Sequence, residues 1–140
     1  MKKELYSLGT SNRSLWEFII ILKGFHIQRA VDVRRFPTSK KFLHFQRDNL
    51  AQALEREGIE YLYMGGSLGG YRKGGYQKYM QTEEFKWALN FLKRLVEEKR
   101  SCIFCCERLY FRCHRRFITQ ALSGEFKIIH IIELNRVREG

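Results

Sequence analysis

The fold is decided by the stretch Ser101-Cys102-Ile103-Phe104-Cys105-Cys106-Glu107-Arg108-Leu109-Tyr110-Phe111-Arg112-Cys113-His114-Arg115-Arg116. Residues 101–106 form a short apolar run that predicts a buried strand, and a helix is expected over 113–122. Residues 105–116 hold three thiols, one carboxylate, one imidazole and four guanidinium groups. Open α/β folds bind ligands where a strand leads into a helix, so these ionisable groups predict a functional site there.

The same succession of strand and helix recurs along the chain. Strands are expected at 5–8, 27–33, 59–64, 101–106 and 127–134, and helices at about 14–24, 48–57, 82–100 and 113–122. Regular alternation of this kind implies a mostly parallel sheet with helices on both faces. The expected fold class is therefore α/β: a single three-layer domain over residues 1–140 with a mostly parallel five-stranded sheet, Rossmann or flavodoxin-like.

Local signals place the helix ends. Ser14 and Glu17 have the spacing of a capping box, Thr82 is expected to cap the longest helix, and Gly58 fits the left-handed position that ends a helix. The segment 65–75 contains six glycines and is expected to be a mobile loop.

The composition indicates a cytoplasmic protein. With 140 residues, 44% of them hydrophobic, the chain can build the core of one domain. It has neither an apolar run of membrane-spanning length nor a signal peptide, so we expect no membrane partner. In the cytoplasm the four cysteines are expected to be reduced thiols rather than disulfides. No cofactor is expected, because the glycine-rich segment matches no nucleotide-cofactor motif. The oligomeric state stays open.

The net charge of +11 is concentrated in three segments that contain no acidic residue, 34–47, 65–79 and 108–116. They hold twelve of the 26 basic residues, which leaves 14 basic against all 15 acidic residues elsewhere. Each segment follows a predicted strand, and the carboxyl ends of parallel strands meet at one edge of a sheet. The sequence therefore predicts an electropositive crevice.

An anionic small molecule or a nucleotide is the first expected ligand of this crevice. The start of the helix at 113–122 offers free backbone N–H groups to an anion, next to several arginines. The alternative is a solvated basic patch whose arginines pair with Glu107 and Asp32. The candidate ligand-binding residues are Ser11, Arg34, Ser39, Arg112, Cys113 and Arg115.

The candidate catalytic residues are Cys105, Glu107, Asp32 and His114. A thiol beside a helix start and arginines has a stabilised thiolate, so Cys105 is a candidate nucleophile; the alternative is inert packing on a central strand. Glu107 or Asp32 would act as a general base, or would only orient arginines. His114 shares a helical face with Ile118, which also suits a half-buried structural histidine.

Two other chemistries use the same cysteines. Cys102, Cys105, Cys106 and Cys113 with His114 include the ligand types of a zinc site, but neighbouring positions of a strand point to opposite faces, so we expect no metal. Cys106 and Arg112 have the Cys-x5-Arg spacing of a phosphatase loop, whereas the residues between them are too large for one.

The second function class is a non-catalytic module that binds DNA or RNA. Cations and aromatic rings alternate in two of the basic segments, and such a mixture suits phosphate contacts and base stacking. The residues assigned to this role are Arg35, Lys40, Lys41, Arg72, Lys73, Arg108 and Arg116.

Three motifs together resemble a known family. They are Thr10-Ser11-Asn12-Arg13-Ser14, Val31-Asp32-Val33-Arg34-Arg35-Phe36-Pro37-Thr38-Ser39, and Cys105-x-Glu107 followed by Arg112-Cys113-His114-Arg115-Arg116. In order and spacing they resemble the domain of unknown function 488. The resemblance implies a compact α/β domain and no activity. It gathers Asp32, Arg34, Ser39, Cys105, Glu107, Cys113, His114 and Arg115 at the suspected site.

The chain departs from the family pattern between these motifs. Residues 108–111 stand where relatives often have an acidic-proline turn, and Cys106 stands where they often have alanine. Both changes make the loop more apolar and more basic.

Overall fold

A computed structural model describes residues 2–140 and contains one six-stranded sheet packed between helices. The strands are β1 (Glu4–Gly9), β2 (Arg29–Asp32), β3 (Glu60–Tyr63), β4 (Ser101–Cys105), β5 (Lys127–Glu133) and β6 (Arg136–Glu139). The helices are α1 (Leu15–Gly24), α2 (Arg47–Arg56), α3 (Gly65–Leu68), α4 (Tyr76–Tyr79), α5 (Glu83–Glu98) and α6 (Arg115–Leu122), with 3₁₀ turns at Leu43–Phe45 and Tyr110–Arg112.

The strand order is β3-β2-β4-β1-β5-β6, and the first five strands are parallel. The α/β prediction is confirmed, but the sheet has six strands rather than five. The additional strand, β6, pairs antiparallel with β5 and is exposed along its length. Its sequence, Arg-Val-Arg-Glu, gives no apolar signal because hydrogen bonds to β5, rather than a buried face, hold it in place.

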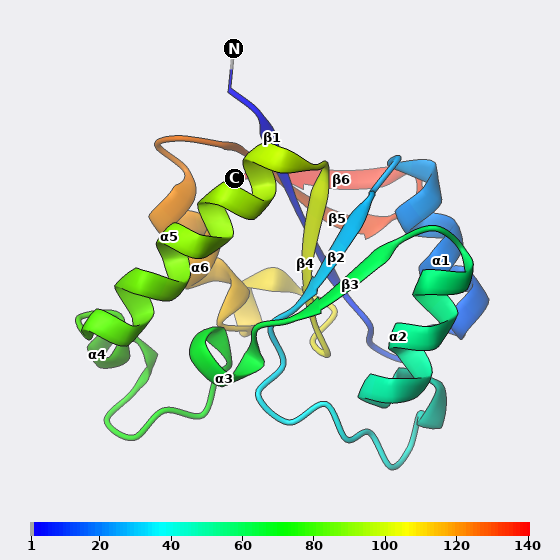
Figure 1. Cartoon of the computed structure of the whole chain (residues 1–140), viewed down its shortest axis with the longest axis horizontal. Coiled ribbons are helices and arrows are strands. Elements are labelled where there is room, and N and C mark those ends of the chain that lie inside the picture. Colours follow the sequence, from blue (N-terminus) through cyan, green and yellow to red (C-terminus); the bar gives the residue numbers. More distant parts are fainter. Residues whose placement is uncertain (1) are drawn as a thin grey trace.

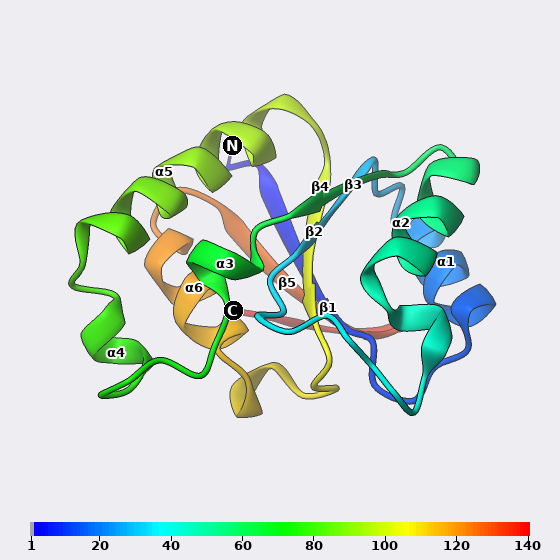
Figure 2. The same cartoon turned by 60° about the horizontal axis from the view of Figure 1, so that its bottom comes forward.

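Helices cover both faces of the sheet, as expected. Figures 1 and 2 show α1 and α2 on one face and α3, α4, α5 and α6 on the other. Along β4, Cys102 and Phe104 pack into the core under α1 and α2, whereas Ile103 and Cys105 pack into the core under α5 and α6. The alternation separates Cys102 from Cys105, as the strand geometry predicted.

Capping residues fix the starts of two helices. The Ser14 hydroxyl accepts a hydrogen bond from the Glu17 amide at 3.0 Å, and the Thr82 hydroxyl accepts one from Phe85 at 3.2 Å. After α2, Gly58 has a φ of +79°, in the left-handed region that favours glycine. These boundaries agree with those expected from the sequence. None of the helices in residues 2–140 is long and apolar enough to cross a membrane.

The topology opens a crevice at the carboxyl end of β4. This strand lies between β1 and β2, which both lead to the face of α1 and α2, whereas β4 leads to α6 on the opposite face. Where the loops after two neighbouring strands run to opposite faces of the sheet, a crevice forms between them, and open α/β sheets bind ligands there. Figure 2 brings this edge forward.

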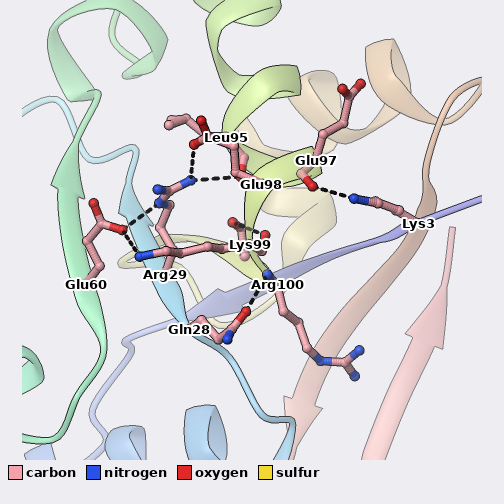
Figure 3. Close-up of polar contacts among 10 residues, drawn as sticks. Lys3, Gln28, Arg29, Glu60, Leu95, Glu97, Glu98, Lys99 and Arg100 are labelled. Atoms are coloured by element: carbon pink, nitrogen blue, oxygen red, sulfur yellow. Dashed lines mark hydrogen bonds and ion pairs between the residues drawn. The ribbon is translucent and has the colours of Figure 1, made fainter.

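The opposite edge of the sheet is closed by ion pairs, as Figure 3 shows. Arg29, which is buried at the start of β2, donates to Glu60 at 2.9 Å, to Glu98 at 3.1 Å and to the carbonyl of Leu95 at 2.8 Å. Lys99 also contacts Glu60, at 3.1 Å. The charges at this edge therefore hold α5 against the sheet.

Candidate functional site

A pocket of about 720 Å³ lies at the carboxyl edge, between the loops that follow β2, β3 and β4. A volume of this size accommodates a small-molecule ligand. Nine of the residues proposed from the sequence line it: Arg34, Arg35, Ser39, Cys105, Glu107, Arg112, Cys113, His114 and Arg116.

A second pocket, of about 390 Å³, adjoins the first. Arg34, Ser39 and Cys106 line both, and Ser11 and Lys41 line only the second. Ser11 has a φ of +49°, an uncommon conformation for a residue other than glycine. The loop after β1 thus joins the other three loops at one site.

Asp32 and Arg34 form a buried ion pair beneath the two pockets. Oδ1 of Asp32 accepts from Arg34 Nε at 2.9 Å, and Oδ2 accepts from Arg34 Nη2 at 2.9 Å and from the Tyr61 hydroxyl at 2.5 Å. Arg34 Nη1 donates to the carbonyl of Phe45 at 2.6 Å. Asp32 is fully buried, so it orients Arg34 and is not placed to be the general base suggested by the sequence.

Arg115 also lies inside the protein rather than in the crevice. It is fully buried, and its guanidinium donates to Cys105 Sγ at 3.1 Å, Ser7 Oγ at 3.2 Å and the carbonyl of Glu107 at 2.6 Å. Burial lowers its pKa to about 10, so it stays cationic at neutral pH. The expectation that Arg115 binds the anion directly is corrected: it anchors the wall of the pocket.

Ser7 and His130 extend this network, and the sequence analysis missed both. They are register partners on β1 and β5, and the Ser7 hydroxyl lies 2.5 Å from His130 Nδ1. Burial lowers the pKa of His130 to about 4, and Tyr110 stacks on its ring at 3.6 Å. Polar residues at facing positions of two buried strands were the signal that could have revealed this network.

The sulfur atoms of Cys105 and Cys113 lie against one another, so these two of the four thiols that were expected to be reduced are placed to form a disulfide. The 3₁₀ turn at Tyr110–Arg112 folds the loop back, so that Cys113, just before α6, meets the end of β4. Cys102 and Cys106 are free, the first buried and the second exposed. Burial raises the pKa of Cys102 to about 12.

His114 is a neutral, half-buried imidazole on the wall of the pocket. Nε2 lies 2.7 Å from the carbonyl of Val33, which only accepts, so Nε2 carries the proton. Nδ1 is therefore the acceptor, 3.5 Å from Cys113 Sγ. Burial lowers the pKa of His114 to about 4.

Three exposed aromatic side chains stand around the mouth of the pocket. Phe36 is 65% exposed, Tyr71 is 85% exposed and Phe111 is 49% exposed, and they come from the loops after β2, β3 and β4 respectively. Tyr71 has a φ of +59°, which is a strained conformation for a bulky residue. Exposure of these rings depends on the loop geometry, which the sequence pattern does not reveal.

The glycine-rich segment 65–75 is not a loop along its whole length. It begins as α3, and a Cβ at Gly69 would lie only 2.6 Å from the Arg35 Cα. Arg72 donates to the carbonyls of Gly69 and Gly66 at 2.9 and 2.8 Å. The glycines thus permit close packing on the loop after β2, and Arg72 holds the segment together instead of facing a ligand.

The remaining basic candidates lie around the site. Lys40 and Lys73 are exposed and line neither pocket. Arg108 is paired with Glu133.

The sequence matches the family described as Domain of unknown function DUF488 over residues 14–75 and 72–122. The chain belongs to this family. No curated protein and no solved structure matches it.

In this DUF488 protein the motif residues lie in or next to the first pocket. Ser39, Glu107 and Cys113 line the first pocket, and Asp32 and Arg115 are buried beneath it. Of the residues that depart from the family pattern, Cys106 and Phe111 line the first pocket, whereas Arg108 pairs with Glu133 and Tyr110 stacks on His130.

Proposed function

We propose that this DUF488 protein binds a nucleotide, a phosphate-bearing ligand with a planar base, in the pocket at the carboxyl edge of the sheet. A single observation carries the proposal. Three exposed aromatic rings from three separate loops, together with the four arginines Arg34, Arg35, Arg112 and Arg116, line one pocket of ligand size.

The arginines supply the anion-binding part. Arg112 and Arg116 are exposed and form no ion pair with a carboxylate of residues 2–140, so their charges are available to a phosphate. Arg35 lies between Phe36, whose ring is 5.6 Å from its guanidinium, and Tyr71, whose carbonyl accepts from it at 3.3 Å. Guanidinium groups bind phosphate through paired N–H donors.

The aromatic rings supply the base-binding part. The centroids of Phe36 and Tyr71 are 6.0 Å apart, and both rings face solvent. Exposed rings on separate loops offer π-faces on which a base stacks, worth about 1–3 kcal/mol per ring. The left-handed conformation of Tyr71 costs free energy, and strained residues of this kind cluster at ligand-binding sites.

Glu107 is the candidate base of an enzymatic reaction in this pocket. Its carboxylate lines the wall, and no side chain of residues 2–140 donates a hydrogen bond to it. A proton of a bound ligand would be accepted there, while the arginines hold the phosphate. A cytoplasmic location would give such a site access to free nucleotides.

The test is calorimetric titration of the full chain with nucleoside mono- and triphosphates. We expect the affinity to fall about tenfold or more in Arg112→Ala, which removes a phosphate contact, and in Tyr71→Ala, which removes a stacking surface for the base. Arg94→Ala and Trp87→Ala are the matched controls, an exposed arginine and an exposed aromatic residue on α5, and should leave the affinity unchanged. The proposal would be contradicted if the control variants lost as much nucleotide affinity as the site variants, or if the wild-type protein bound no nucleotide.

A second candidate function, single-stranded nucleic-acid binding without chemistry, is supported by the continuity of the two pockets. Lys41 in the second pocket extends the basic surface beyond the first pocket. Here, oligonucleotide affinity is expected to fall steeply with salt, and Lys40→Ala and Lys41→Ala should each reduce the salt slope by about one unit. Fluorescence anisotropy across a salt series measures this slope. A slope near zero for the wild-type protein would exclude the second function.

A further inference from the structure

Four arginines of this chain are buried, and they differ in what neutralises them. Arg13 pairs with Glu17, Arg29 with Glu60 and Glu98 (Figure 3), and Arg34 with Asp32. Arg115 is the exception, because no carboxylate oxygen of residues 2–140 lies within 4.0 Å of it. The nearest group able to carry a negative charge in direct contact is the sulfur of Cys105, 3.1 Å from Nε.

A buried cation without an anionic partner is costly, and proteins avoid it by pairing the charge. The other donors of Arg115 meet a hydroxyl and two carbonyls, which are neutral acceptors. The Glu107 carboxylate acts on Arg115 only through space, without contact. In the reduced protein, a thiolate at Cys105 would therefore complete the ion pair.

Cys113 has the surroundings of a partner thiol. Its sulfur accepts from the Arg115 amide at 3.5 Å, at the first residue of α6, and lies 3.5 Å from the unprotonated Nδ1 of His114. His114 is neutral, and β1 contributes only the Ser7 hydroxyl to this cluster, so the Arg115 guanidinium is the charged group in contact with Cys105, whereas Cys113 meets only the backbone amide of Arg115. Cys105 and Cys113 both line the pocket, and their sulfur atoms lie against one another.

We propose that Cys105 and Cys113 form a reactive dithiol–disulfide couple on the pocket wall, in which Arg115 holds Cys105 as the thiolate that reduces a small hydroperoxide. Cys105 is only 1% exposed, so its co-reactant must be small, as hydrogen peroxide is. The couple requires no nucleotide and stands independently of the proposed function.

The reaction has two steps. The Cys105 thiolate attacks the terminal oxygen of the peroxide, an S–O bond forms, the O–O bond breaks, and the departing hydroxide takes a proton from solvent. The Cys113 thiol then attacks the sulfur of the Cys105 sulfenic acid, an S–S bond forms, the S–O bond breaks, and hydroxide leaves as water with the thiol proton. Two thiols are oxidised to one disulfide, and one peroxide is reduced to two waters.

The experiment starts from the fully reduced chain. Hydrogen peroxide is added at pH 7, free thiols are alkylated at successive times, and mass spectrometry maps the modified and linked peptides. We expect an intramolecular Cys105–Cys113 link that forms at least about tenfold faster than Cys106 is oxidised. Cys106 is the internal control, because it is exposed, lines the same pocket and accepts no hydrogen bond from a guanidinium of residues 2–140, although Arg34 and Arg115 act on it through space.

Variants separate thiolate activation from proximity. In Cys113→Ser, Cys105 should stop at the sulfenic acid, and its oxidation rate should stay constant down to about pH 7.5 or lower, whereas an ordinary thiol slows below about pH 8.5. Arg115→Lys should retain the rate, and Arg115→Gln should lose about tenfold or more. If Arg115→Gln does not fold, the pH profile of Cys113→Ser still shows whether Cys105 is held as a thiolate.

Three results would overturn the couple: oxidation of Cys105 no faster than that of Cys106, a link to a cysteine other than Cys113, or a Cys105 rate that falls with pH as an ordinary thiol does. Nucleotide titration of the Cys105→Ser/Cys113→Ser protein distinguishes this failure from failure of the proposed function. That variant cannot form the couple but keeps Arg112 and Tyr71.

Discussion

Replacing Asp32 with alanine is expected to lower the free energy of unfolding by about 3 to 5 kcal/mol, because it leaves the buried Arg34 guanidinium without its counter-charge. The carboxylate is fully buried and accepts from Arg34 Nε and Nη2 and from the Tyr61 hydroxyl. All of these donors would lose their partner in a place that water does not reach. Urea unfolding followed by circular dichroism measures the loss.

Two further variants identify the cause. Asp48→Ala makes the same substitution at an exposed position in the first turn of α2, where only a helix-dipole contribution of about 0.3 to 1 kcal/mol is removed. Asp32→Asn keeps an acceptor and removes the charge, so it should fall between wild type and Asp32→Ala. If Asp32→Ala has the same free energy of unfolding as Asp48→Ala, the ion pair does not hold the loop after β2.

The elements that position the site could be predicted because local signals and topology agree. Apolar runs of strand length alternate with helical periodicity, and Ser14, Gly58 and Thr82 mark helix ends by local hydrogen bonding or backbone conformation. In a parallel sheet, the loops after successive strands must emerge at one edge. The convergence of the basic loops therefore followed from the sequence without knowledge of any distance.

The depth of each side chain could not be predicted in this way. Arg112, Arg115 and Arg116 are similar in sequence, yet α6 turns Arg115 into the core and leaves the other two at the pocket. Its burial depends on the Ser7 hydroxyl of β1, which is 108 residues away in sequence, and on how the nearby loop after β4 turns the Glu107 carbonyl toward it. The pairing of Cys105 with Cys113 depends likewise on a 3₁₀ turn inside a loop that has no periodic pattern.

Acidification from pH 7 to pH 5 is expected to remove about 1 to 2 kcal/mol of folding stability for each of two buried histidines. Burial lowers the pKa of His114 and of His130 to about 4, against an ordinary value of 6.5. The folded protein thus holds both rings neutral, while the unfolded chain binds protons below pH 6.5. Their contribution is fully present above pH 6.5 and is lost as the pH falls toward 4.

The contacts of the two rings explain why protonation opposes folding. A protonated His114 would be a buried charge near the guanidinium groups of Arg115 and Arg72, and a protonated His130 would add a buried charge to the network that already contains Arg115. Urea unfolding at a series of pH values measures the effect. His114→Gln and His130→Gln should each remove the contribution of that histidine to the pH dependence of the free energy of unfolding. The arginine and lysine partners of Glu60 lower its pKa, so its contribution to folding stability is lost only below the ordinary pKa of 4.5. A loss of stability between pH 6.5 and pH 5 is therefore assigned to the histidines. Unfolding free energies that stay constant across this window would mean that the rings reach solvent and that the Ser7, His130 and Arg115 network opens in solution.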